Sequence, residues 1–131
     1  MNTIIDIANA VVECLSDYSA ELQYAPDYVL SKLSEQRVVV VPMAKERKII
    51  SRNSVEQSHQ IEIGFLYRSK ELNLVELIGI VERIGASFLG KRLLSETCVS
   101  VAHEPIYSAD DLRGKNQFTS VIALTFKEVG S

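Results

Sequence analysis

The stretch that decides the fold is Gln117-Phe118-Thr119-Ser120-Val121-Ile122-Ala123-Leu124-Thr125-Phe126. Its large apolar residues Phe118, Ile122, Leu124 and Phe126 stand at even positions, whereas Thr119, Thr125 and Lys127 stand at odd ones. A period of two is typical of a strand that buries one face. The pattern therefore predicts a long final strand over residues 118–129, anchored in the core by its aromatic and branched side chains.

The residues before this strand predict a second strand over 97–104 and then a polar corner. The corner begins at Pro105-Ile106-Tyr107 and is expected to project from the sheet between Tyr107 and Gln117. Within it, Ser108 suits the cap of a short helical turn, and Gly114 suits its end.

The remaining pattern predicts amphipathic helices over 3–15 and 73–89, and strands over 21–24, 37–42, 46–52 and 58–67. Thr3 and Asn73 suit helix N-caps, since their side-chain oxygens can accept from free backbone amides. Pro26 is expected to break the first strand, and Val29, Leu30 and Leu33 indicate a short apolar turn or helical piece. The order αββββαββ predicts one α+β domain over 1–131: a mainly antiparallel (mixed) β-sheet with two amphipathic helices packed on one face.

Composition excludes several classes of protein. The chain has 131 residues and a formal net charge of −3, so it lacks the basic excess of a general nucleic-acid binder. The two cysteines, Cys14 and Cys98, form no close metal or redox motif and are expected to be ordinary thiols in a reducing compartment. The N-terminus does not resemble a secretory signal, and charged residues interrupt the longest helix, which argues against a membrane span.

Candidate catalytic residues are few and scattered. His59 and His103 lie in expected strands, outside any metal-ligand spacing, and a strand histidine is more often a surface or satisfied residue. Cys98 lacks a sign of thiolate activation, and Asp110-Asp111 fits the start of a helical turn better than a pair of catalytic carboxylates. No glycine-rich phosphate loop is present. We therefore expect no cofactor, no metal and no enzyme activity.

Two features point to contacts with other proteins. Val38-Val39-Val40-Val41 places apolar groups on both faces of a strand, so either the domain covers both faces or one face meets another subunit. The cations Lys45, Arg47, Lys48 and Arg52 gather in one expected hairpin. They form either a solvated edge that resists aggregation or a patch for an acidic partner, including DNA in a ring.

Several segments in order resemble the tail terminator and tail completion proteins of long-tailed phages. They are Tyr24-Ala25-Pro26-Asp27, Val38 to Pro42, Ser51-Arg52, Gln60-Ile61-Glu62-Ile63-Gly64, Glu104-Pro105-Ile106-Tyr107 and Gln117 to Val121. The resemblance implies a structural virion protein, located in the tail or neck and assembled in the host cytoplasm. It implies a homo-oligomeric ring, hexameric in that family, which ends the tail tube and presents a surface for head joining.

The partners implied are copies of the same chain, the tail tube protein and head connector or neck proteins, with passive contact to DNA in the lumen and none to a membrane. A head–tail connector or neck protein is the alternative within this class. A small ligand-binding regulatory module and a small hydrolase are alternatives outside it. The residues we expect at subunit or partner contacts are Val39, Val41, Arg47, Lys48, Arg52, Tyr107 and Arg113.

Overall fold

The computed structural model describes residues 2–25, 30 and 35–130, in which six strands form one sheet. The elements are α1 (Ile4–Cys14), a 3-10 turn η1 (Ser16–Tyr18), β1 (Glu21–Leu22), β2 (Glu35–Ser51), β3 (Ser54–Arg68), α2 (Leu74–Phe88), β4 (Arg92–Leu93), β5 (Glu96–His103), α3 (Ala109–Lys115) and β6 (Gln117–Gly130). Among the described residues, no helix is long and apolar enough to cross a membrane.

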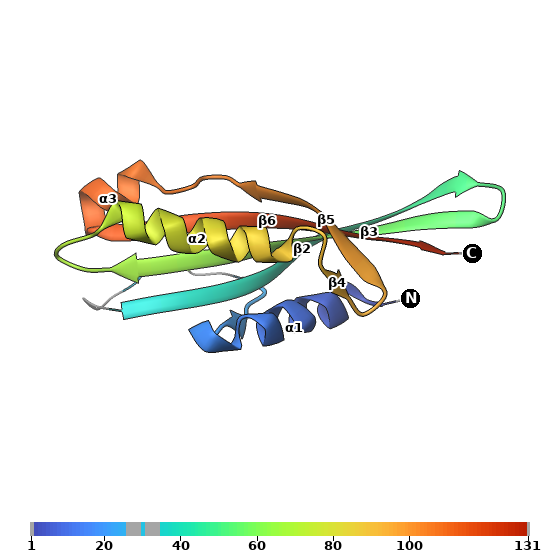
Figure 1. Cartoon of the computed structure of the whole chain (residues 1–131), viewed down its shortest axis with the longest axis horizontal. Coiled ribbons are helices and arrows are strands. Elements are labelled where there is room, and N and C mark those ends of the chain that lie inside the picture. Colours follow the sequence, from blue (N-terminus) through green and yellow to red (C-terminus); the bar gives the residue numbers. More distant parts are fainter. Residues whose placement is uncertain (1, 26–29, 31–34, 131) are drawn as a thin grey trace.

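The sheet is mixed, with strand order β1-β2-β3-β6-β5-β4. Only β1 runs parallel to its neighbour β2, and the other pairs are antiparallel. The last strand, β6, therefore lies in the centre between β3 and β5 (Figure 1). The α+β class and the mainly antiparallel sheet are confirmed.

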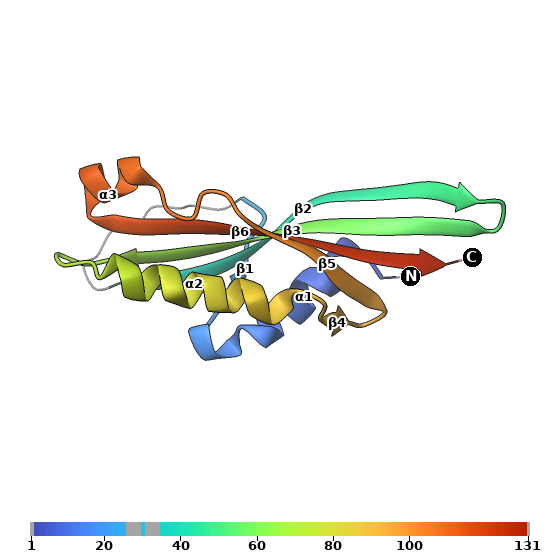
Figure 2. The same cartoon turned by 45° about the horizontal axis from the view of Figure 1, so that its top comes forward.

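Helices α1 and α2 lie on one side of the sheet, as expected (Figure 2). They cover alternate residues of the strands, which form the main core: Val38, Val40, Ile61, Ile63, Phe65, Phe118, Ile122, Leu124 and Phe126. Three of the expected helix caps are present, because Thr3, Asn73 and Ser108 each accept a backbone amide three residues ahead.

The opposite face of the four-valine segment is covered within the chain. Val39 and Val41 are buried with Leu30 and Leu66 in a second apolar cluster. Alternate valines therefore belong to two cores, one on each face of the strand. This explains why both odd and even positions of the segment are apolar. Pro26, Val29 and Leu33 lie outside the described residues.

The main correction concerns β2. Strands expected over 37–42 and 46–52 are one strand, with a register shift between Pro42 and Ala44. The described part of β1 pairs with β2 only at Val39 and Val40, so β2 is an edge of the sheet at Pro42. Because no strand lies on its outer side there, the missing amide of Pro42 costs no hydrogen bond and the strand continues. The tip expected over 53–56 is a two-residue turn at Arg52-Asn53, and the next residues already belong to β3.

Smaller differences lie at element ends. The corner holds a full third helix, α3, which ends at Asn116 in the left-handed conformation (φ 52°) rather than at Gly114. The short strand β4, absent from the expected order, pairs with the start of β5. The first strand is shorter than expected and covers only Glu21–Leu22.

Candidate assembly surface

The β2–β3 hairpin continues as an arm, residues 45–57, beyond the two helices (Figures 1 and 2). Every β2 residue from Met43 to Ser51 is exposed, and Ile49 is 79% exposed. An exposed edge strand carrying large apolar residues is a site for contact with another chain.

The register of the hairpin divides the arm's charges between its two faces. Lys45, Arg47 and Ile49 pair with His59, Gln57 and Val55, and so share the face on which the helices pack. Glu46, Lys48 and Ile50 occupy the other face, because side chains alternate along a strand.

On that second face, the Lys127 ammonium lies 2.9 Å from the Glu56 carboxylate. Their hydrogen bond lowers the pKa of Glu56 and raises the pKa of Lys127. Lys48 adds a weaker Coulombic influence on Glu56. Arg52, on the turn, makes no ion pair with any described residue.

A buried polar network holds the root of the arm. His59 Nδ1 lies 2.6 Å from Glu96 Oε1, and both side chains are fully buried. Gln57 Nε2 donates to Glu96 Oε2 and to the backbone oxygen of Asn2, while Arg47 Nε donates to Gln57 Oε1. The network thus joins the arm to β5 and to Asn2, two residues before α1. The alternating sequence places His59 on the buried face, but nothing in it identifies Glu96 as the partner.

The expected contact residues do not form one site. Arg47, Lys48 and Arg52 lie together on the arm. Tyr107 and Arg113 flank the start of β6, whereas the arm lies beside its end, because Val55 pairs with Gly130. Both are exposed, and Arg113 pairs with Asp110 at 3.1 Å.

The other residues considered for catalysis are Cys98, His103 and Asp111, and each packs or bonds within the fold. Cys98 is buried, and desolvation raises the pKa of its thiol. His103 packs beneath Gly85 of α2. Asp111 accepts from the hydroxyl of Thr119 at 2.6 Å, which ties α3 to β6. Among the described residues, no group of three His, Cys, Asp or Glu side chains is placed to hold a metal ion.

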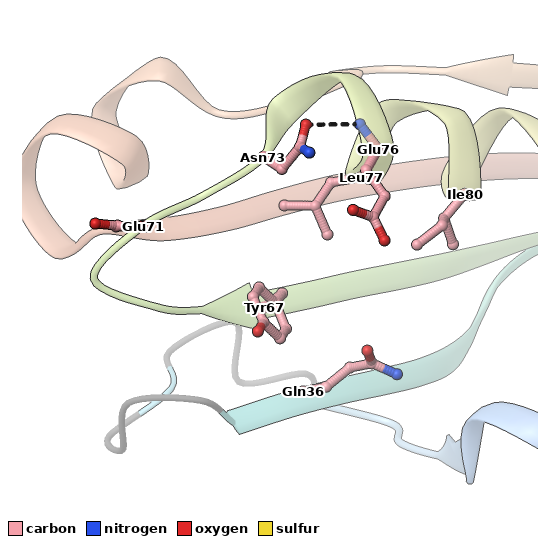
Figure 3. Close-up of a pocket in the computed structure, with 7 residues that line it drawn as sticks. All are labelled: Gln36, Tyr67, Glu71, Asn73, Glu76, Leu77 and Ile80. Carbon is pink, nitrogen blue, oxygen red and sulfur yellow. Dashed lines mark hydrogen bonds between the residues drawn. The ribbon is translucent and has the colours of Figure 1, made fainter.

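A pocket of about 320 Å³ opens at the end of the molecule opposite the arm's tip, between the start of α2 and strands β2 and β3. Its apolar wall is formed by Leu77 and Ile80, which point from α2 toward the strands (Figure 3). Glu76 extends from the same helix toward Tyr67, whereas the Glu71 side chain points away from the other labelled residues (Figure 3). We call this the α2 pocket.

Comparison with known proteins gives little further information. No protein-family model and no curated protein matches the sequence. Among solved structures, the chain is similar to the sheath/tube terminator of PVC, an extracellular contractile injection system, determined by cryo-EM in the extended state. The TM-score is 0.48 at 11% identity, over 100% of this chain and 58% of that one. A likeness of this size establishes neither a shared fold nor a shared function.

Proposed function

We propose that this protein is a structural component of a long-tailed phage virion. In this role it forms a ring at the head-proximal end of the tail tube, ends growth of the tube and provides the surface for head joining. It acts by contact with other proteins and not by catalysis. DNA passes through the lumen of the ring without specific recognition.

The observation that carries the proposal is the arm. It extends past the helices, exposes Ile49 and Ile50, and carries the cations expected at a contact surface. The ordered segments that resemble tail completion proteins add independent support from sequence. Because Val39 and Val41 are already covered within the chain, the arm is the better contact surface.

Head-to-tail contact between copies accounts for the ring. A contact that joins two different surfaces closes into a ring when the rotation between copies allows closure. A closed ring has no free subunit contact left in its plane, and tube polymerisation ends because the ring's outer face binds the head connector rather than another tube ring.

Sedimentation velocity at micromolar concentration tests assembly, both alone and with isolated tail tubes. We expect a discrete oligomer, or an oligomer that forms at tube ends. A strict monomer under both conditions contradicts the proposal. Binding to isolated heads but not to tubes supports a connector or neck role instead.

A second experiment tests the arm in the virion. Reversing the charges of Arg47, Lys48 and Arg52 is expected to block tail completion or head joining while far-ultraviolet circular dichroism stays unchanged. Arg83→Glu is a suitable control, since Arg83 is exposed on α2, away from the arm. Normal infectious particles from the triple variant remove the arm from the interface.

A further inference from the structure

The tip of the arm and the α2 pocket have complementary chemistry. The tip presents Arg52, which has no ionic partner among the described residues, beside the highly exposed Ile49. The pocket presents the carboxylate of Glu76 beside the aromatic ring of Tyr67 and the aliphatic wall of Leu77 and Ile80 (Figure 3). The tip thus carries a cation next to an apolar side chain. The pocket, at another place on the molecule, carries the opposite charge next to an apolar wall.

We propose that the arm tip of one copy docks in the α2 pocket of the next copy. The Arg52 guanidinium binds the carboxylate of Glu76, and Ile49 packs on Leu77 and Ile80. Tyr67 supplies a ring face, on which a guanidinium stacks favourably. This contact rests on the proposed function, because it identifies the surfaces that would join neighbouring subunits of the ring.

The two surfaces cannot meet within one molecule. The tip and the pocket lie at opposite ends of the long axis of the sheet (Figures 1 and 2). The amide of Glu76 is already capped by the side-chain oxygen of Asn73, so the group that Glu76 offers to a partner is its carboxylate. The pocket therefore favours a cation, and a second copy of the chain carries one at the required place.

A charge-swap experiment tests the contact. Arg52→Glu and Glu76→Arg are each expected to weaken self-association by at least about tenfold, the scale of close charge pairs at interfaces. The double variant, which carries both changes in every copy, restores the opposite charges and is expected to recover the oligomer. Sedimentation velocity measures association, and circular dichroism confirms folding. Arg83→Glu again serves as the matched control.

Each outcome separates this contact from the broader proposal. If the single variants associate like the wild type, or if both lose association and the double variant does not recover it, the docking is wrong while the ring stands. A wild-type monomer, alone and with tubes, overturns both. If Arg52→Glu keeps the oligomer but no longer binds tubes, the tip contacts the tube and not a second copy. Glu76→Lys replaces Glu76→Arg if that variant fails to fold.

Discussion

Gly85 stands where α2 comes closest to the sheet. A Cβ atom at this position would lie 2.7 Å from His103 Nε2 and 3.0 Å from Val101 Cγ1. Such contacts are too close for a carbon atom, so a side chain of β5 would have to move. At Gly79 a Cβ atom would meet only the Arg83 side chain, at 3.7 Å, which is an ordinary contact. Of these two glycines, Gly85 therefore marks a close approach of the helix to the sheet, and Gly79 does not.

These two glycines give a matched prediction. Gly85→Ala is expected to lower the free energy of unfolding by about 1–3 kcal/mol, because overpacking outweighs the gain in helix propensity. Gly79→Ala is expected to raise it by up to about 1 kcal/mol, since alanine favours a helix and nothing obstructs it. Urea unfolding measures both. Equal effects of the same sign would show that the contact with His103 does not restrict position 85.

The buried pair His59–Glu96 shows what residue patterns can and cannot predict. The alternation around Ile61 and Ile63 correctly places His59 on the covered face. The partner comes from another strand, 37 residues away in the chain, and no local rule connects the two. Tertiary packing alone brings the carboxylate to the imidazole.

Among the elements, α1 has the clearest link between sequence and stability. Thr3 and Asp6 form a reciprocal cap: the Thr3 amide donates to Asp6 Oδ2, and the Asp6 amide donates to Thr3 Oγ1. The hydrogen bonds from Thr3 lower the pKa of the Asp6 carboxyl, with a smaller contribution from Lys45. A carboxyl whose pKa is lowered by folding adds stability above its unfolded pKa, and this stability is lost as the pH falls through the folded value.

Asp6→Asn tests this effect, because an amide oxygen can still accept from Thr3 but does not titrate. The wild type is expected to be more stable than the variant above the ordinary aspartate pKa of 3.8. The difference should shrink as the pH falls below that value through the lowered folded pKa. Melting temperatures over a pH series measure it, and other carboxylates cancel because both proteins contain them. A constant difference across the series would contradict the assigned role of Asp6.

Element type was easier to predict than element extent. Periodicity and caps located α1, α2 and the long strands, because these signals are local. The sequence predicts two strands where the structure has the single strand β2, because a proline such as Pro42 normally interrupts a central strand. Only the sheet order shows that this part of β2 is an edge. The α2 pocket was missed for a similar reason: Gln36, Tyr67 and Glu76 come from three elements.

At the scale of the whole molecule, the arm is separate from the two cores. Replacing Lys48–Glu56 by Asn-Gly would join Arg47 to its cross-strand partner Gln57 through a two-residue hairpin turn. The melting temperature is expected to stay within about 5 °C, because the deletion removes exposed and half-buried residues but no buried one, and one surface ion pair. Assembly should be lost. A shortened protein that still forms the wild-type oligomer would show that the arm is dispensable.

The central position of β6 has a consequence for synthesis. This strand leaves the ribosome after β3 and β5, yet it holds β3 on one side and β5 on the other. Until it emerges, the sheet exists only as two unconnected parts, and the arm has no third strand to brace its base. A chain that stops before Gln117 loses the middle of the sheet rather than an edge. Premature termination before Gln117 is therefore expected to leave a chain that cannot complete the sheet.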